Sequence, residues 1–411
     1  MEQITPFNAL ATEADYVIIE LFGGDNNLSH FVYEDLNEMA AGINANIAVI
    51  GLADLANKPA SVVEVSRGNG IQTLEEWGEI DTGDPEILMR FLVRALITYP
   101  KARRAIGFWD HGTGVFDETD ATEKLLSRSM HSVQRVDRSR SFAARRLFFP
   151  KSKLINDPQT RSMLHDDTNG GVLTNLEAAK MIASAFKLAG VTQPIDLIFS
   201  DTCLNGMIEV LEQFGPYAHC IVGSPELEPG DGWDYQRWLS RVSTELPKTP
   251  FDWGRTAVEA FHDGYKPYPA KFPCTLGAFR TKNDITAAFS ALMRTSRRDG
   301  GYDTMFFLDH ARAKAQDFAK RDTYDLRSFA ERVVAIADTK PELAKAARDL
   351  IVAIDEAKVH NCCLGDTVTG SNGLAFWFPS SSSAMKRDIK TYERLDFSSK
   401  SGWGDFLKEF R

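Results

Sequence analysis

Long apolar segments are absent from this sequence. No run of apolar residues approaches the roughly 18 to 20 that a membrane-spanning helix needs. The opening residues, 1 to 6, contain neither a basic cluster nor the apolar stretch of a secretory leader. The sequence therefore predicts a protein that has no membrane partner and stays in the cytoplasm.

Cysteine is scarce. The 411 residues include five cysteines, an odd number that contains the adjacent pair Cys362 and Cys363. Such usage does not fit a disulfide framework, and the spacing does not fit a zinc site. We expect free thiols and no metal bound by cysteine.

Positive charge is also in deficit. Lys and Arg number 47 against 57 Asp and Glu, which gives a formal net charge of −10 at pH 7. A general nucleic-acid-binding protein needs a basic face to displace counterions from phosphate. The composition argues against that class and favours a cationic partner.

An apolar strand that ends at a cysteine is the most informative stretch. The run from Ile195 to Asp201 predicts a buried strand, and Cys203 follows it after one residue. Apolar residues then recur at steps of three and four up to Phe214, which predicts a helix with one buried face. Cys203 would lie at the N-terminus of that helix, where unpaired N–H groups and the helix dipole favour the nucleophilic thiolate. The alternative is an inert buried cysteine.

A second apolar strand, residues 105–109, leads to Asp110, His111 and Gly112. In an open α/β sheet the carboxyl ends of neighbouring strands face one crevice, so His111 and Cys203 can meet although 91 residues separate them. We interpret His111 as the base and Cys203 as the nucleophile. The backbone N–H groups of Gly112 and Cys203 are candidates for holding an oxyanion. A capping or surface histidine is the alternative.

The order of these and other motifs resembles the clostripain family of cysteine peptidases, relatives of caspases, gingipains and legumain. The resemblance runs from Tyr16 to Phe410. Val115 replaces a tryptophan that is usual in the family, and Thr202 replaces a common alanine, which bears on the shape of the subsites. The motifs that carry the resemblance, besides the two strand ends, are Phe22–Leu28, Gly78–Pro85, Asp166–Thr168 with Leu173–Thr174, Ser224–Trp233, Asn372–Pro379 and Gly402–Leu407.

The resemblance implies a caspase-like three-layer α/β/α sandwich with a mainly parallel central sheet. It also implies a Cys203–His111 dyad that needs no metal in the chemical step, and it assigns basic specificity to carboxylates at the positions of Asp201 and Asp231. Two carboxylates bind Arg in bidentate fashion and would favour it over Lys. The alternatives are that Asp201 caps the next helix and that Asp231 is a turn residue.

The predicted elements alternate between strand and helix, which is typical of a mainly parallel sheet covered on both faces. After the first strand, Asp25 is expected to cap the following helix. We predict a catalytic core over residues 1–245, with a basic insert at about 121–165, and a helix-rich C-terminal α/β subdomain over 246–411 that extends the same sheet. Predicted elements are strands at 16–22, 46–52, 61–65 (with a hairpin turn), 219–223, 274–279 and 373–378, the last extending the central sheet, and helices at 85–98, 176–188, 325–336 and 341–357.

The insert is rich in basic residues. From Lys124 to Arg161 there are ten Lys or Arg and two acidic residues. Frequent serine and weak periodicity are typical of an exposed loop. Members of the clostripain family are cut after a basic residue between histidine and cysteine, so the insert resembles an activation segment. A solvated loop, or a surface that contacts nucleic acid or another anionic partner, is the alternative. Candidate self-cleavage positions are Lys124, Arg128, Arg135, Arg138, Arg140, Arg145 and Arg146.

An acidic segment follows the insert. Asp166, Thr168, Gly171 and Glu177 fall at positions one, three, six and twelve of a calcium-binding EF-hand loop, but position five offers no side-chain oxygen. A capping box of Thr174 and Glu177 that opens the next helix is the simpler interpretation. Some members of the clostripain family respond to calcium. Calcium is therefore retained as a candidate activator with unassigned ligands, and no cofactor is expected to be required.

The function predicted from the sequence is a cysteine endopeptidase that acts on proteins or peptides with exposed Arg or Lys and is activated by self-cleavage. A caspase-like pseudo-enzyme or regulatory scaffold that binds an acidic partner through the insert is the alternative. A metal hydrolase built on His111, His131 and His165 is a third hypothesis, which no tight ligand spacing supports. No particular oligomeric state is predicted.

Overall fold

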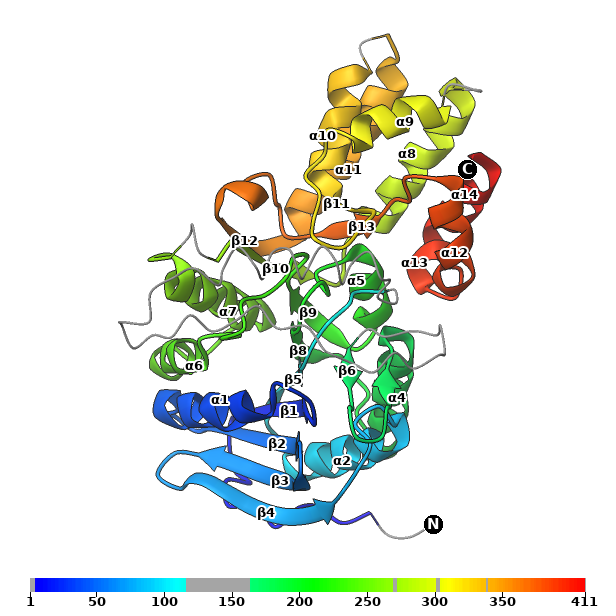
Figure 1. Cartoon of the computed structure of the whole chain (residues 1–411). Coiled ribbons are helices and arrows are strands. Elements are labelled where there is room, and N and C mark those ends of the chain that lie inside the picture. Colours follow the sequence, from blue (N-terminus) through cyan, green and yellow to red (C-terminus); the bar gives the residue numbers. More distant parts are fainter. Residues whose placement is uncertain (1–3, 116–162, 269–271, 301–303, 338, 411) are drawn as a thin grey trace, which may run out of the picture.

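A nine-stranded β-sheet forms the centre of the molecule (Figure 1). The computed structural model describes residues 4–115, 163–268, 272–300, 304–337 and 339–410. Within these residues the strand order is β12 (Lys358–Leu364), β10 (Cys274–Arg280), β9 (Ala218–Gly223), β8 (Ile195–Asp201), β5 (Arg103–Trp109), β1 (Tyr16–Gly24), β2 (Ile47–Leu55), β3 (Lys58–Ser66) and β4 (Gly70–Gly78).

The five central strands, from β9 to β2, are parallel, and the two strands at each edge run antiparallel to their neighbours. Every residue of β1 and β2 is buried. Parallel strands of this kind need both faces covered, which explains their continuous apolar sequences. The predicted strands at 16–22 and 46–52 are confirmed, as is the hairpin that follows residues 61–65.

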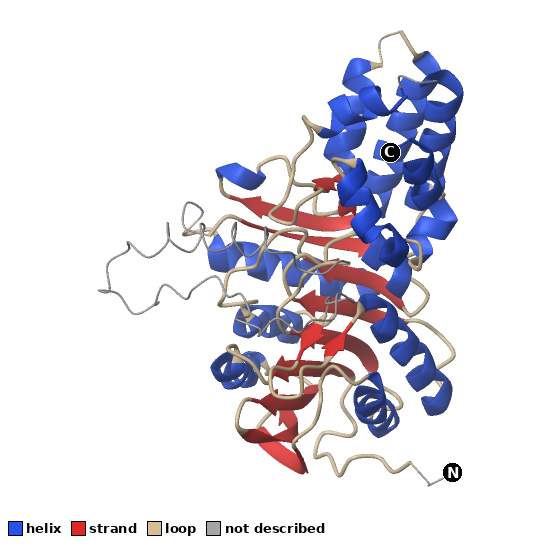
Figure 2. Ribbon diagram, turned by 45° about the vertical axis from the view of Figure 1, so that its right-hand side comes forward, coloured by secondary structure: helices blue, strands red, loops and turns tan. Residues whose placement is uncertain are grey.

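Helices cover both faces of the sheet (Figure 2). Two separate hydrophobic clusters fill the spaces between the layers. The predicted α/β fold with a mainly parallel central sheet is therefore confirmed. In the described part of the chain, no helix combines the length and apolarity that crossing a bilayer requires. One face carries α1 (Ser29–Gly42), α6 (Tyr235–Thr244) and α7 (Pro250–Tyr265), and the other carries α2 (Pro85–Thr98), α4 (Asn175–Ala189) and α5 (Ile208–Phe214).

Local capping explains why two helices begin where the sequence predicts. Asp84 accepts a hydrogen bond from the Glu86 N–H at 2.8 Å at the start of α2. At the start of α4, Thr174 and Glu177 form the reciprocal bonds of a capping box, both at 3.1 Å. These interactions involve residues at most three apart, so the sequence is sufficient to place them.

The cap predicted for α1 is wrong. The N-cap of α1 is Leu28, which makes no side-chain bond, and Asp25 lies three residues earlier. The Asn26 side chain, whose oxygen accepts from the Leu28 N–H at 2.8 Å, shapes the turn into the helix instead. Asp25 is only 2% exposed, and its carboxylate lies beside those of Asp54 and Asp166 instead.

The C-terminal region is mostly helical and packs around a cluster of aromatic side chains. Phe289, Phe376 and Trp403 are fully buried in it, with ring centroids 5.4 to 6.3 Å apart. The elements of this region are α8 (Ile285–Gly300), α9 (Thr304–Arg312), β11 (Thr323–Asp325), α10 (Leu326–Ile336), α11 (Pro341–Ala357), the 3-10 helix η2 (Asp366–Val368), β13 (Ala375–Trp377), α12 (Ser382–Tyr392), α13 (Asp396–Ser401) and α14 (Trp403–Phe410).

The prediction that residues 373–378 extend the central sheet is wrong. This segment forms β13, which pairs with β11 in a separate two-stranded sheet. The strands that extend the central sheet are β10 and β12. β9 lies before the predicted boundary at residue 245 and β10 lies after it, and the two strands pair with each other. β12 has the sequence Lys-Val-His-Asn-Cys-Cys-Leu and is mostly half-buried, so it carries no continuous apolar signal.

Candidate active site

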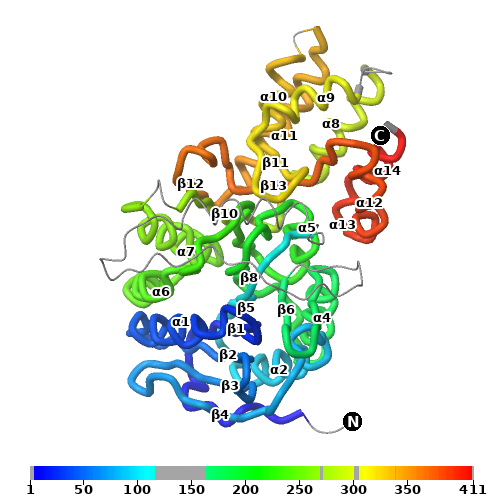
Figure 3. The backbone as a smooth tube through the Cα atoms, viewed as in Figure 1, coloured from blue at the N-terminus to red at the C-terminus, as the bar shows by residue number. Residues whose placement is uncertain are grey.

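The two strands that precede His111 and Cys203 are neighbours at the centre of the sheet (Figure 3). β5 and β8 are parallel, and Trp109 lies opposite Asp201. The Asp110 N–H donates to the Asp201 carbonyl at 3.4 Å, so both chains leave the sheet side by side. The expectation that the two strand ends meet at one edge is confirmed.

Gly112 lies directly against the backbone of Cys203. A Cβ atom added at Gly112 would lie 2.0 Å from the Cys203 carbonyl oxygen and 2.8 Å from its amide nitrogen. Cβ contacts that short do not occur in folded proteins, so only glycine fits here. The His111–Gly112 segment and Cys203 are thus in van der Waals contact.

His111 is held by a residue that sequence reasoning did not single out. Its Nε2 atom lies 2.9 Å from Oδ1 of Asn27, in the loop between β1 and α1. Because an amide oxygen accepts, this contact assigns the proton to Nε2 and leaves the lone pair on Nδ1. Burial, with a smaller effect from His165, lowers the pKa of His111 to about 3. The imidazole is therefore neutral at neutral pH and in the form of a base.

Cys203 has its thiol near the loop that follows β9. The Glu228 N–H donates to Sγ at 3.2 Å. Burial raises the pKa of the Cys203 thiol far above its usual value, and the negative charge of Glu228 adds to the effect. The described part of the chain contains no hydrogen bond between this thiol and the His111 imidazole. In this conformation both groups are neutral rather than a thiolate–imidazolium pair.

The predicted position of Cys203 at a helix N-terminus is wrong. α5 begins at Ile208, and the intervening residues form an irregular turn in which Leu204 has a φ of 66°. The Gly206 N–H donates to the Ser224 carbonyl at 2.7 Å, and the Gly206 carbonyl accepts from the Ala375 N–H at 2.8 Å. Distant segments thus hold this turn, and a helical sequence period cannot reveal them. The helix dipole therefore does not lower the pKa of Cys203.

Asp201 is buried at the end of β8, and it does not cap the next described helix, α5, whose N-cap is Met207. It is 5% exposed, and its Oδ2 accepts from the Trp233 N–H at 3.2 Å. The side chains of Glu228 and Tyr235 also contact it, and burial is the main cause that raises its pKa. Glu228 is 6% exposed, and its pKa is raised by burial and then by the charge of Asp201. Glu228 is a second buried acid at this site, which the sequence analysis missed.

The loop that carries Asp231 packs against Asp201. Gly232 has a φ of 61°, and a Cβ atom added there would lie 3.0 Å from Oδ2 of Asp201. The Tyr265 hydroxyl donates to the Gly232 carbonyl at 2.7 Å and fixes the loop. The structure therefore brings the two predicted specificity segments together, with Asp231 half-buried.

Several predicted residues lie outside the described residues. They include His131 of the metal-hydrolase hypothesis and every candidate self-cleavage position from Lys124 to Arg146. Asp166 lies after β6 (Leu164–His165), in a tight turn to β7 (Val172–Leu173). Glu177 forms the capping box with Thr174. The EF-hand interpretation is therefore wrong, and the simpler capping interpretation is confirmed.

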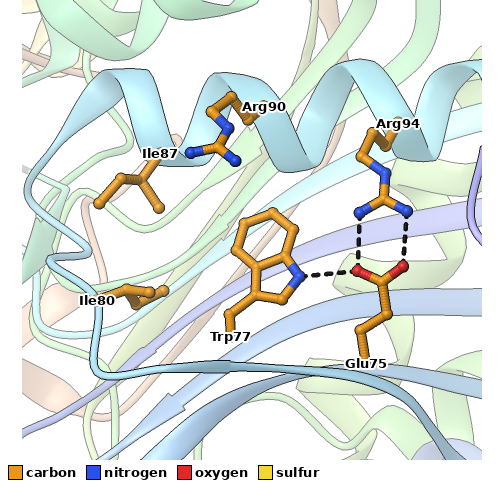
Figure 4. A pocket seen from close by; sticks show the side chains of 6 residues that line it. All are labelled: Glu75, Trp77, Ile80, Ile87, Arg90 and Arg94. Atoms are coloured by element: carbon orange, nitrogen blue, oxygen red, sulfur yellow. Dashed lines mark hydrogen bonds and ion pairs between the residues drawn. The ribbon is translucent and has the colours of Figure 1, made fainter. Parts of the chain in front are cut away.

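A pocket of about 400 Å³ lies elsewhere, between β4 and α2 (Figure 4). Two hydrogen bonds of 2.6 and 2.7 Å join Arg94 to Glu75 there, and the Trp77 indole donates to the same carboxylate at 2.9 Å. The pocket contains none of the predicted site residues. It is lined by Glu75, Trp77, Ile80, Ile87, Arg90 and Arg94.

Comparisons with known proteins give a family and a fold. A model of the clostripain family matches residues 21–131 and 151–410. No curated protein matches the chain. A secreted C11 cysteine protease from Bacteroides thetaiotaomicron, solved with an irreversible peptide inhibitor, is 14% identical with a TM-score of 0.63, over 95% of this chain and 99% of that one. An inactive zymogen C11 protease from Parabacteroides distasonis is 16% identical with a TM-score of 0.66, over 94% and 98%.

Proposed function

Since the chain belongs to the clostripain family of cysteine peptidases, we propose that it is an endopeptidase in which Cys203 is the nucleophile and His111 the general base. The observation that carries this assignment is the contact between Gly112 and the Cys203 backbone at the adjacent ends of β5 and β8. This contact brings the segment that carries the His111 imidazole and the Cys203 thiol to one edge of the sheet, although the two residues are distant in sequence.

In the proposed reaction His111 accepts the thiol proton while Sγ attacks the substrate carbonyl carbon. The tetrahedral oxyanion is held by the N–H groups of Gly112 and Cys203, which donate to no other group within the described parts of the chain. His111 then gives its proton to the departing amine, which leaves a thioester on Cys203. Water, deprotonated by His111, hydrolyses the thioester and restores the thiol.

The neutral state of the Cys203 thiol and the His111 imidazole supports the interpretation that this conformation is an enzyme form that has not yet been activated. With the pKa of Cys203 raised and that of His111 lowered, proton transfer has to accompany attack on the carbonyl. A small movement that brings the two groups into hydrogen-bond contact would lower this barrier. That a related fold has been solved as an inactive zymogen supports the proposal.

Asp201 and Asp231 are the proposed determinants of cleavage after Arg and, less well, after Lys. The contact of Gly232 with Asp201 supports a shared acidic site behind the thiol. A guanidinium would neutralise the Asp201 carboxylate, which burial otherwise disfavours in the charged form. Asp231→Asn should raise the KM for Arg substrates more than it changes kcat. An equal loss for Arg and uncharged substrates would contradict this role.

Self-cleavage in the basic insert is the proposed activation step. A tethered segment reaches an effective concentration on the order of millimolar, so it is cut before external peptides. Cuts between Lys124 and Arg146 would release an N-terminal piece of about one third of the mass. The family match omits residues 132–150, which supports an insert peculiar to this chain. An active wild type that stays intact would contradict the step.

One experiment tests the proposed function. Wild type, Cys203→Ala and the control Cys363→Ala, which alters another partly buried thiol, are assayed with an Arg-amide fluorogenic peptide and an Arg-chloromethylketone. We expect turnover and labelling of Cys203 in the wild type and the control, and neither in Cys203→Ala. Turnover in Cys203→Ala would overturn the proposal, and a wild type without labelling would favour the scaffold alternative.

The cytoplasmic location stays a prediction. A similar structure is described as a secreted protease, which gives this prediction no support. Fractionation of cells that express the full native gene would test it.

A further inference from the structure

A small apolar cluster adjoins the Cys203 thiol. Leu204 is 4% exposed and Leu227 is 9% exposed, and the half-buried Cys203 and Ala319 pack against them. We call these four residues the thiol-side cluster. It is separate from the two hydrophobic clusters that fill the spaces between the layers. Because Cys203 and Ala319 are only half-buried, a substrate that reaches the thiol also meets apolar surface.

The turn after β8 holds Leu204 beside Cys203 in a strained backbone conformation. Leu204 has a φ of 66°, in the left-handed region that a leucine avoids. Its N–H donates to the Glu226 carbonyl at 3.1 Å. Strained residues persist only where the surrounding structure determines them, and they concentrate at functional sites. The strain therefore supports a functional role for an apolar side chain beside the thiol.

The C-terminal region supplies the fourth member of the cluster. Residues 316–325 fold back on themselves, and the Asp325 N–H donates to the Gln316 carbonyl at 2.8 Å. Ala319 lies within this hairpin, and its N–H donates to Oε2 of Glu226 at 3.0 Å. Glu226 belongs to the loop after β9, so the hairpin is fixed against that loop. The C-terminal region thus contributes a wall of the candidate active site.

The sheet order indicates which part of a substrate meets the cluster. β8, which leads to Cys203, lies between β5 and β9. His111 follows β5, and in the proposed reaction it protonates the departing amine, so the part of the substrate C-terminal to the cleaved bond lies on that side. Leu227 and Asp231 belong to the loop after β9, on the other side. The arginine and the residue N-terminal to it therefore lie toward this loop.

We propose that the thiol-side cluster is a subsite for the residue immediately N-terminal to the cleaved arginine, and that it selects an apolar side chain. This inference rests on the proposed role of Cys203. An apolar side chain would cover the leucine and alanine side chains. A carboxylate would lose water to surfaces that offer no donor, and it would approach Glu226 and Glu228, which border the cluster. Ala319 offers only a methyl group, so the room at this subsite depends on its small size.

Fluorogenic peptides test the subsite in wild type and in Ala319→Leu. Three N-acetylated dipeptide amides carry glycine, leucine or aspartate before arginine. In wild type, kcat/KM should be about tenfold or more higher with leucine than with glycine, and lowest with aspartate, because an apolar pocket discriminates by about that factor. Ala319→Leu fills the subsite and should bring the leucine-to-glycine ratio to about one, while the glycine peptide is cleaved as by wild type.

Two further variants complete the experiment. Ala313→Leu is the matched control, because it adds the same side chain at an exposed position of the same region, and it should leave all three rates unchanged. Ala319→Gly removes the methyl group but keeps the backbone bond to Glu226, and it should extend the preference to phenylalanine. This variant tests the subsite independently if Ala319→Leu folds poorly.

Three results would overturn the subsite: equal cleavage of the leucine and glycine peptides by wild type, an equal loss for all peptides in Ala319→Leu, or the same change of ratio in Ala313→Leu. An equal loss for all peptides would mean that Ala319 positions the thiol and does not contact the substrate.

Binding of the peptides to Cys203→Ala separates this inference from the proposed function. Measured by calorimetry, the Kd of the non-fluorogenic leucine–arginine amide should be lower than that of the glycine–arginine amide, and Ala319→Leu in this background should remove the difference. Selective binding without turnover in any Cys203-containing protein would refute the peptidase and keep the subsite. Turnover with equal binding and equal cleavage of the peptides would refute the subsite alone.

Discussion

Gly112→Ala is a sharp test of the contact that joins the two candidate catalytic segments. The added Cβ would lie 2.0 Å from the Cys203 carbonyl oxygen and 2.8 Å from the Cβ of Thr202. Both neighbours follow a central strand directly, so neither can swing aside as a long side chain would. Relief of the 2.0 Å contact to an ordinary contact of about 3.4 Å therefore displaces one segment by more than about 1 Å.

A displacement of that size has a calculable effect. Moving reacting groups by about 1 Å costs about 100-fold in rate, which corresponds to about 2.7 kcal/mol in the activation free energy. Overpacking by one methyl group destabilises a protein by about 1 to 3 kcal/mol, which for a chain of this length lowers the melting midpoint by about 1 to 4 °C. The variant should thus stay folded at 25 °C while kcat/KM falls about 100-fold.

The measurement is kcat/KM with an Arg-amide peptide together with a thermal unfolding curve. Gly264→Ala is the matched control: it lies in α7, and its nearest contact would be an ordinary 3.4 Å from Asp234. It should keep activity within about twofold and gain slightly in stability, because alanine favours helix. The reasoning is refuted if Gly112→Ala keeps wild-type kcat/KM, or if its loss of activity only follows loss of folded protein.

Asn27→Ala should lower kcat by about tenfold or more and change its pH profile, with an unchanged melting midpoint, because the amide positions His111 while Asn27 itself is exposed; a loss confined to KM would contradict it. Burial raises the pKa of Glu209 to about 7, so its protonated form stabilises the fold below about pH 4.5, and this stabilisation is lost as pH rises through 7. Wild type should lose about 2 to 3 kcal/mol of unfolding free energy between pH 5 and 8, measured in urea, whereas Glu209→Gln, which can still accept from the Trp377 N–H and Tyr392 hydroxyl, should lose much less. The pKa of His111 is lowered to about 3, so the unfolded chain binds the proton first as pH falls below about 6.5. The free energy of unfolding of the wild type should therefore fall by about 2 kcal/mol between pH 7 and 5, whereas that of His111→Gln should not show this loss. An identical dependence of unfolding free energy on pH in the two proteins would contradict the assignment.

The sequence by itself was sufficient for elements whose causes are local or whose burial is continuous. α2 spans the predicted 85–98 because Asp84 and the proline after it start it, and α4 begins where Thr174 and Glu177 cap each other. β5 is apolar from Ala105 to Trp109 and β8 from Leu197 to Phe199, and the rule that parallel strands end at one edge brings His111 and Cys203 together.

Tertiary structure alone decided the features that depend on segments far apart in the chain. Asn27 reaches His111 across 84 residues, and the Glu228 N–H reaches the Cys203 thiol across 25. No periodicity or cap encodes such contacts, because they arise when loops meet at the end of a sheet. β13 likewise pairs with β11 and not with the central sheet, through a contact between segments that are distant in the chain. Asp25 is the clearest case: it has the sequence context of a helix cap, and only the tertiary structure brings its carboxylate beside those of Asp54 and Asp166.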